Sequence, residues 1–302
     1  MSQSVTPAAV PDLDPVAVDR WLKRPRQSSP WLNEEVARRM ESRLDWITQR
    51  PEHWIHWSPL LGGLAAHARL LARYPEARCQ IQGEQVEAAS ALLEGQARGP
   101  GWRRWLDRWT RPTPIADLEP QAADLVWANM VLHLYPRPDE VLKQWLSALR
   151  TGGFVMFSCL GPDTLKEWRQ WHREEGMAPP AHAMTDMHDW GDMLVETGFA
   201  QPVMDMERLT LTYPSAERMI EDLRSWGRNL HRERARRTWS RQERQRWLDR
   251  LEAGMPRQTD GQLFLTFELI YGHAIKPAPR VKLAESTAVS LSDMRTLLRQ
   301  SR

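Results

Sequence analysis

The sequence is poor in the residues that mark several protein classes. It has two cysteines, Cys79 and Cys159, in 302 residues, and neither stands near a second cysteine or a group of histidines. This spacing indicates neither a disulfide framework nor a metal site, so we expect a reducing, cytoplasmic setting. Phenylalanine and tyrosine are scarce (5 and 4) beside 16 tryptophans, which we interpret mainly as packing residues.

The chain also lacks an excess of one charge and any long apolar run. Lys and Arg total 41 against 39 for Asp and Glu, a formal net charge of +2, so the overall balance shows no nucleic-acid footprint. The longest apolar stretches have the length of strands, which predicts no membrane-spanning helix. Residues 1–19 lack the basic start and apolar run of a signal peptide. A hydrophobic share of 41% is that of an ordinary globular protein.

Strands and helices alternate through the first half of the sequence. Such alternation predicts βαβ units and a parallel sheet, and the second half adds antiparallel-like strands after a helical insertion. Residues 99–120, rich in Trp, Arg and Pro, are left unassigned. The predicted strands are 54–57, 78–84, 124–129, 154–158, 203–206, 209–212 and 263–272; the predicted helices are 64–74, 85–97, 139–150, 163–175, 187–197, 215–226 and 241–252.

Residues 15–49 form the leading helical segment. Asn33 is the expected N-cap, with acidic residues in the turn that follows. Further along, Asp163 and Ser215 are expected to cap the helices that follow them. An apolar stripe at helical spacing predicts the buried face, and it consists of Leu32, Val36, Met40, Leu44 and Ile47.

Several segments together resemble a known family. They include the strand 124–129 followed by Leu132-His133, and the segments 149–154, 157–167, 187–192, 198–199, 205–213 and 271–273. In these residues the chain resembles the class I S-adenosylmethionine-dependent methyltransferases, and among them the malonyl-acyl-carrier-protein O-methyltransferases of biotin synthesis. The resemblance spans about residues 20–276. A mitochondrial complex I assembly factor regarded as a protein-arginine hydroxylase shares the pattern, so the fold alone does not fix the reaction.

The resemblance implies a fold and a division of the chain. We expect an α/β domain with a Rossmann-like, mostly parallel seven-stranded sheet and helices on both faces. The implied division is a disordered N-terminus (1–15), leading helices (16–50), a core (51–213), a basic helical insertion (215–255), a final strand (262–275) and a tail (277–302), with 16–276 as the methyltransferase-like domain.

The loop after the first strand departs from the family pattern. There the family carries an acid and then glycines, D-x-G-x-G-x-G, which let backbone N–H groups approach the cofactor. Here His56 stands near the place of the acid, while Trp57, Pro59 and Leu61 fall where small residues are usual. Only the pair at 62–63 remains glycine. A tyrosine that the family carries before the leading helix is also lost.

An acid still closes the second predicted strand. Glu84 lies about 20 residues after the loop, a separation at which a carboxylate reaches ribose hydroxyls; the alternative is that it caps the following helix. Asn129 ends the central strand, at the edge where parallel sheets meet ligands. The residues expected to bind S-adenosylmethionine are therefore Trp57, Gly62, Gly63, Glu84 and Asn129.

No residue is selected as catalytic. His133 and Tyr135 follow the central strand, and they either face the methyl acceptor or pack the next loop. Cys159 has no base beside it, which argues against a nucleophile. Methylation of a carboxylate needs no general base, and the chemistry is mainly orientation of the acceptor oxygen.

An arginine-rich stretch covers residues 224–250. It is interpreted either as a solvated helical surface or as a docking surface for an acidic acyl-carrier protein. Nucleic acid is disfavoured, because the aromatic residues are too sparse for a stacking platform. The arginines are Arg224, Arg228, Arg232, Arg234, Arg236, Arg237, Arg241, Arg244, Arg246 and Arg250.

Two hypotheses for function remain. The first is a methyltransferase that modifies malonyl-acyl-carrier protein in biotin synthesis. The second, favoured by the altered loop, is a pseudoenzyme that keeps the fold as a regulatory or assembly partner without binding the cofactor. Hydroxylation would need a metal or oxidant site, for which His133, His188 and Asp189 are too few. The oligomeric state is left open.

Overall fold

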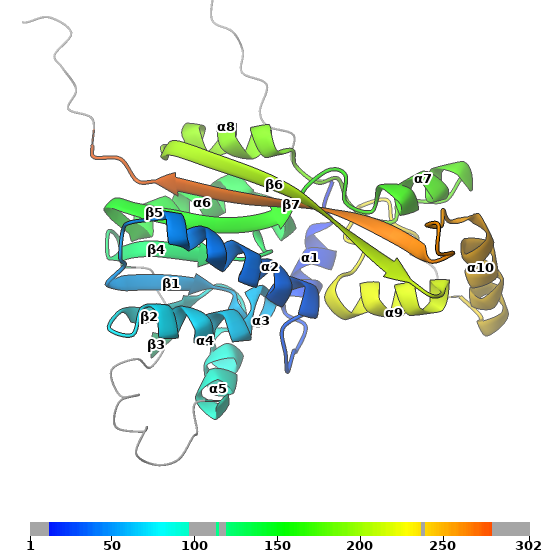
Figure 1. Ribbon diagram of the computed structural model, residues 1–302, viewed down its shortest axis with the longest axis horizontal. Helices are drawn as coiled ribbons and strands as arrows, with labels where there is room; N and C mark the ends of the chain where they lie inside the picture. Colours follow the sequence, from blue (N-terminus) through cyan, green and yellow to red (C-terminus); the bar gives the residue numbers. More distant parts are fainter. Residues whose placement is uncertain (1–11, 97–112, 115–118, 237–238, 280–302) are drawn as a thin grey trace, which may run out of the picture.

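The computed structural model describes residues 12–96, 113–114, 119–236 and 239–279 (Figure 1). Seven strands form one sheet in the order β3-β2-β1-β4-β5-β7-β6. Six have five residues or more, whereas β3 is a two-residue pairing at the edge. The strands are β1 (His53–Trp57), β2 (Arg78–Gln82), β3 (Thr113–Pro114), β4 (Ala123–Ala128), β5 (Leu149–Leu160), β6 (Ala200–Tyr213) and β7 (Leu263–Ile275).

The sheet is mixed, as the order of elements predicts. Strands β3, β2, β1, β4 and β5 pair in parallel, while β7 pairs antiparallel with both β5 and β6. All six residues of β4 are buried, because a central parallel strand is covered on both faces and needs an apolar run. The strands predicted at 203–206 and 209–212 are in fact one strand, β6. The polar Glu207-Arg208 lies on an edge strand, where one side faces solvent.

Helices cover both faces of the sheet (Figure 1). Successive residues of β1 point to opposite faces, so Trp54 joins the core under α2 and α4, whereas Ile55 and Trp57 join the core under α6 and α8. The helices are α1 (Pro15–Leu22), α2 (Trp31–Arg43), α3 (Pro59–Gly62), α4 (Leu64–Arg73), α5 (Val86–Gln96), α6 (Pro138–Ala148), α7 (Lys166–Glu174), α8 (Met187–Thr197), α9 (Ala216–Trp226) and α10 (Arg241–Gly254), with 3-10 turns η1 (Leu44–Trp46) and η3 (Leu132–Leu134).

The leading helical segment is divided into α1 and α2. Pro25 and Pro30 separate the two helices, because proline disfavours helix in the preceding residue. The prediction of Asn33 as N-cap is wrong, since α2 begins at Trp31. The Asn33 amide instead donates to the carbonyl of Leu61 at 2.9 Å. The predicted stripe is confirmed as buried from Leu32 to Leu44.

Strands β6 and β7 run past the parallel strands toward α7, α9 and α10 (Figure 1). Ser215 caps α9 through its hydroxyl, as predicted. Asp163 does not cap α7, which begins at Lys166; its carboxylate instead pairs with Arg208 at 2.9 Å. None of the helices in the described ranges is long and apolar enough to cross a membrane.

The end of the segment expected to be disordered (1–15) is ordered. Residues 1–11 lie outside the described residues. Leu13, however, is fully buried and pairs with His231, and the Asp14 amide donates to the carbonyl of Leu230 at 2.8 Å. Composition favoured disorder here, but a single apolar side chain and a carboxylate anchor these residues to a segment more than 200 positions later.

Candidate cofactor and acceptor sites

The altered loop lies where the carboxyl ends of three parallel strands meet. β1 ends at Trp57, Ser58 adopts a left-handed backbone (φ 50°), and α3 leads to Gly63, whose φ of 133° favours glycine. β1 lies between β2 and β4. Glu84 and Asn129 follow these two flanking strands, so the fold brings both to the loop at the edge where parallel sheets bind ligands.

The Glu84 carboxylate is held by the chain's own hydroxyl groups. Ser58 Oγ donates to Oε2 at 2.7 Å, and the Tyr135 hydroxyl lies 2.9 and 3.0 Å from the two carboxylate oxygens. Trp57 Nε1 donates to the Tyr135 oxygen at 2.8 Å. Burial and the neighbouring carboxylate raise the pKa of Tyr135. Because Glu84 follows β2 and Tyr135 follows β4, their hydrogen bond crosses the end of β1.

Asn129 is likewise satisfied within the protein. Its side chain is fully buried, and its amide nitrogen donates to the carbonyls of Asn33 (2.7 Å) and Gly62. Its oxygen accepts from Ser158 Oγ at 2.6 Å. Asn129 thus ties the leading helix, the altered loop and β5 together.

The N-terminus of α4, the helix after the loop, is also occupied. Ser29 Oγ accepts from the Leu64 amide at 2.8 Å, and the Glu34 carboxylate accepts from the Ala65 and Ala66 amides at 3.0 and 3.2 Å. These amides are the donors that a helix N-terminus offers to an anion. In this structure Ser29 and Glu34 of the leading segment accept hydrogen bonds from these amides.

His56, at the place of the family's acid, faces α4. Its Nδ1 lies 3.0 Å from Nδ1 of His67, and the two rings stack at 5.2 Å. Burial lowers the pKa of both, that of His67 to about 4. A neutral pair therefore replaces the carboxylate that the resemblance implies.

These contacts bear on S-adenosylmethionine, the cofactor that the fold implies. Ser58 and Tyr135 hold the Glu84 carboxylate, and the phenol lies over the end of β1. The Trp57 ring turns into the core, with its centroid 5.7 Å from that of Trp145. In this conformation these groups are engaged within the chain, so cofactor binding would require the Tyr135 side chain to leave the end of β1. The structure gathers the five predicted residues at one edge, and their role in cofactor binding stays a prediction.

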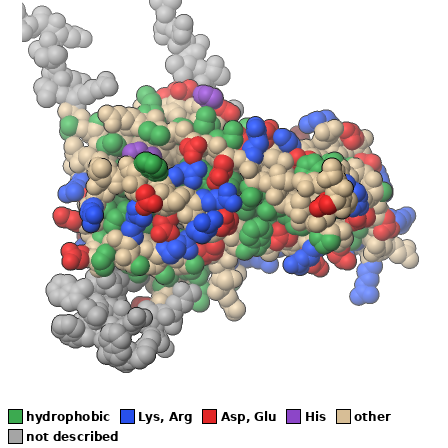
Figure 2. All heavy atoms as spheres, viewed as in Figure 1, with side chains coloured by type: hydrophobic (Ala, Val, Ile, Leu, Met, Phe, Trp, Pro, Cys, Tyr) green, Lys and Arg blue, Asp and Glu red, His purple; other side chains and the backbone are tan. Residues whose placement is uncertain are grey.

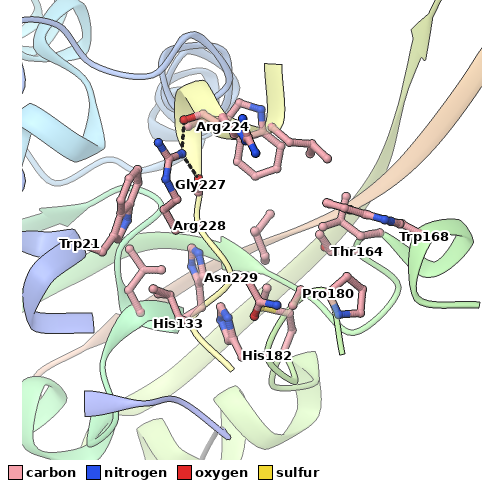
Figure 3. Close-up of a pocket in the computed structure, with 18 of the residues that line it drawn as sticks. Trp21, His133, Thr164, Trp168, Pro180, His182, Arg224, Gly227, Arg228 and Asn229 are labelled. Carbon is pink, nitrogen blue, oxygen red and sulfur yellow. Dashed lines mark hydrogen bonds between the residues drawn. The ribbon is translucent and has the colours of Figure 1, made fainter. Parts of the chain in front are cut away.

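A cavity of about 250 Å³ opens beside the loop (Figure 3). It lies between the ends of β4 and β5, α9 and the segment after α9. Apolar side chains make up most of its wall, and the polar groups are few. The lining includes Trp21, Asn33, Leu61, Met130, His133, Leu134, Leu160, Thr164, Leu165, Trp168, Pro180, Ala181, His182, Met184, Ile220, Leu223, Arg224, Trp226, Gly227, Arg228, Asn229, Leu230 and Trp247.

Two buried histidines lie next to each other in the cavity wall (Figure 3). His133 and His182 are 5% and 4% exposed, and their rings stack with centroids 6.4 Å apart. By geometry, Nδ1 of His133 and both nitrogens of His182 have no hydrogen-bond partner, although the His133 backbone lies close enough to His182 to oppose the fall in its pKa. Burial lowers the pKa of His133 to about 3 and that of His182 to about 4, so both rings are neutral near pH 7. Unpartnered buried donors at a cavity indicate a polar ligand group.

The arginines of residues 224–250 differ in their surroundings. Arg234 and Arg236 pair with Asp14 at 2.7 and 3.2 Å, and Arg244 pairs with Glu217 at 3.3 Å. Arg224 and Arg228 instead line the cavity. Elsewhere the surface is mixed, and Figure 2 shows Lys and Arg interleaved with Asp and Glu on the face that carries α2. Arg237 lies outside the described residues.

Sequence reasoning missed several cavity residues. His182 stands in a proline-containing stretch with no periodic pattern, and Trp21 and Trp168 read only as packing residues. A buried histidine is not visible in sequence until its neighbours are known. Both cysteines are buried thiols whose pKa burial raises. Across the described ranges, no three His, Cys, Asp or Glu side chains form a possible metal group.

The strand order and the ligand edge define a class I methyltransferase-type fold. A solved structure from Bacillus halodurans C-125, provisionally described as a methyltransferase, matches 81% of this chain and all of its own chain, with 14% identity and a TM-score of 0.51. The chain belongs to the malonyl-[acyl-carrier protein] O-methyltransferase family. The relative from Laribacter hongkongensis is 39% identical over 263 residues (83% of this chain, 86% of the relative). That from Gallionella capsiferriformans is 37% identical over 261 residues (84% and 87%). No protein-family model matches the sequence.

Proposed function

We propose that the protein methylates the free carboxylate of a malonyl group on acyl-carrier protein, with S-adenosylmethionine as the methyl donor. The proposal takes its reaction from the name that the relatives carry. The observation that supports it in this chain is the cavity with its unpartnered histidine pair beside the carboxyl ends of the strands. The cytoplasmic location and a place in biotin synthesis are part of the same proposal.

The cavity suits a carrier-bound acyl group. Its apolar wall excludes water, and neutral imidazoles donate hydrogen bonds to carbonyl or carboxylate oxygens without adding charge. A carboxylate is nucleophilic as it stands, so the protein has to orient it rather than remove a proton. In this proposal His133 and His182 hold the acyl group, and Leu61 and Met130 form the wall nearest the altered loop.

The donor side sets a condition on this activity. The Glu84 carboxylate already accepts hydrogen bonds from Ser58 and Tyr135, so a ribose would compete with these groups for it. The chain must therefore exchange internal hydrogen bonds for cofactor contacts, which weakens binding by the free energy of the internal bonds. We expect weak affinity for S-adenosylmethionine in the unmodified chain.

The carrier is proposed to dock on the arginine-rich surface of residues 224–250. Carrier proteins of this kind are acidic, and complementary charge steers such partners. Internal ion pairs engage Arg234, Arg236 and Arg244, so the arginines at the cavity contribute most. A docked carrier would thus sit over the cavity opening.

The test combines product analysis with calorimetry. Malonyl-carrier protein incubated with S-adenosylmethionine should gain the mass of one methyl group. The affinity for S-adenosylmethionine should rise about tenfold or more in Tyr135→Ala, because the phenol leaves the end of β1, a change worth about 1.4 kcal/mol. Tyr74→Ala, at the other end of α4, is the matched control and should leave the affinity unchanged.

Two outcomes decide the proposal. Methyl ester formed by the unmodified protein supports it. Absence of both ester and heat at millimolar S-adenosylmethionine, in the unmodified protein and in Tyr135→Ala, overturns it and points to a pseudoenzyme.

A further inference from the structure

Three arginines surround one tryptophan at the cavity, and a fourth lies beside one of them. Trp21 lies in the last turn of α1, and the guanidinium carbons of Arg26, Arg228 and Arg24 lie 4.5, 5.5 and 6.0 Å from its ring centre. Arg224 is one turn before Arg228 along the chain, and both line the cavity with Trp21 (Figure 3). We call Arg24, Arg26, Arg224 and Arg228 the arginine cluster.

The cluster is electrostatically strained. The pKa of Arg26 falls to about 10, chiefly through burial and then through the charge of Arg24, while Glu84 opposes the change. Burial, followed by Arg24 and Arg224, likewise lowers the pKa of Arg228. None of the four forms an ion pair with a carboxylate of the described residues, in contrast to Arg234, Arg236 and Arg244. Like charges gathered with no carboxylate in ion-pair contact indicate a place for an anion.

A purely structural role explains only part of the cluster. Arg26 donates to the carbonyls of Trp21 (2.8 Å) and Arg24 (3.0 Å), and Arg228 donates to those of Arg224 and Gly227 (2.7 Å). These bonds satisfy the carbonyl ends of α1 and α9. They do not account for the exposed side chains of Arg24 and Arg224 beside them.

The cluster and the cavity together describe one elongated ligand. An anionic group would meet the arginines and the Trp21 ring, an uncharged chain would follow the apolar wall, and a carbonyl would meet His133 and His182. We propose that the arginine cluster binds the phosphate of the phosphopantetheine arm on which an acyl carrier bears its acyl group. This inference rests on the proposed function for the identity of the arm.

The experiment uses two probes on the full chain, 4′-phosphopantetheine and its dephosphorylated form, pantetheine. Calorimetry should show the phosphorylated probe binding about tenfold or more tightly, which corresponds to about 1.4 kcal/mol. The preference should shrink as salt rises from 50 to 500 mM, because salt screens exposed charges. Arg24→Gln/Arg228→Gln should abolish the preference for the phosphorylated probe. Arg241→Gln/Arg246→Gln, which removes two exposed arginines of α10, should retain it.

The outcomes separate this inference from the proposed function. Equal affinities for the two probes, a preference that survives in the cluster variant, or no binding of either probe overturns the phosphate site. If the cluster variant does not fold, the unmodified protein provides the test: a preference that does not shrink between 50 and 500 mM salt overturns the phosphate site. Methyl ester formation and cofactor heat are measured separately. A phosphate preference with neither ester nor cofactor heat would overturn the proposed function alone, and methylation without the preference would overturn only the phosphate site.

Discussion

Two regions lie at the same edge of the sheet. The methyl-donor side contains the altered loop, Glu84 and Asn129, and the methyl-acceptor side is the cavity with His133 and His182. The two regions differ in how these polar side chains are paired. On the donor side, Glu84 and Asn129 are hydrogen-bonded within the chain, although His56 and His67, behind the altered loop, each keep Nε2 without a partner. On the acceptor side, His133 and His182 keep nitrogens without partners next to a cavity. Paired groups stabilise the fold, whereas unpaired buried groups cost free energy and persist where a ligand completes them. The acceptor side is thus organised for a ligand, while the donor side is closed on itself.

The largest effect is expected from removing a paired group on the donor side. Asn129→Leu leaves the Gly62 carbonyl and the Ser158 hydroxyl without this partner, at about 1–3 kcal/mol for each buried group, and removes a second hydrogen bond from the Asn33 carbonyl. We expect the free energy of unfolding in urea to fall by about 3 kcal/mol or more. Gln144→Leu on the exposed face of α6 is the control, within about 0.5 kcal/mol. A loss below about 1 kcal/mol for Asn129→Leu would show that the donor side is not closed as described.

Filling the cavity should abolish ligand binding without touching the donor side. Ala181→Trp places a large ring in the cavity wall, and we expect the affinity for 4′-phosphopantetheine to fall about 100-fold, or about 2.7 kcal/mol. Ala183→Trp, exposed and two residues away, should bind normally. Equal binding by both variants in calorimetry would place the arm elsewhere.

The buried histidines predict how stability depends on pH. The folded-state pKa values of His133 (about 3) and His182 (about 4) lie below the usual 6.5. From about pH 6.5 down to those values, the unfolded chain binds protons that the folded chain does not, so stability is lost as pH falls. Each histidine contributes up to about 1.4 kcal/mol per pH unit.

His133→Gln should reduce the change in the free energy of unfolding with pH by up to about 1.4 kcal/mol per pH unit, the contribution of one histidine. Unfolding in urea at several pH values between 6 and 4 measures it. Gln144→Leu, which removes no titratable group, should keep the slope of the unmodified protein. An unchanged slope in His133→Gln would mean that His133 protonates in the folded state.

The smallest effect has the opposite sign to that of Asn129→Leu. His182→Phe replaces a ring with two unpartnered nitrogens by an apolar ring of similar shape, so the free energy of unfolding should stay equal or rise by about 1 kcal/mol. Binding of the acylated arm should weaken about tenfold. Urea unfolding that shows a loss above about 2 kcal/mol would mean that His182 has internal partners.

The features that could be predicted from the sequence are those set by the periodicity of apolar residues and by the positions where strands end. The buried run at β4, the stripe of α2 and the meeting of Glu84 and Asn129 at one edge all follow from regular geometry. The hydrogen bond between Tyr135 and Glu84 was not predicted. The two residues are 51 positions apart, and they meet only because their side chains reach across the end of β1. His182 was not predicted either, because its burial depends on packing between irregular segments. Asn33 fitted the pattern of a cap, but with Pro30 at the N-cap position the helix begins three residues earlier than that cap requires.

The contact between Leu13, Asp14 and residues 230–236 makes one wall of the cavity depend on a distant part of the chain. The Asp14 carboxylate accepts from Arg234 and Arg236, and Arg232 donates to the carbonyl of Leu13 at 2.8 Å. Leu230 connects the two regions, because its carbonyl accepts from the Asp14 amide and the residue lines the cavity. An engineered deletion or fusion that perturbs Leu13 would therefore alter ligand affinity, so recombinant versions of this protein should be compared only when that stretch is intact.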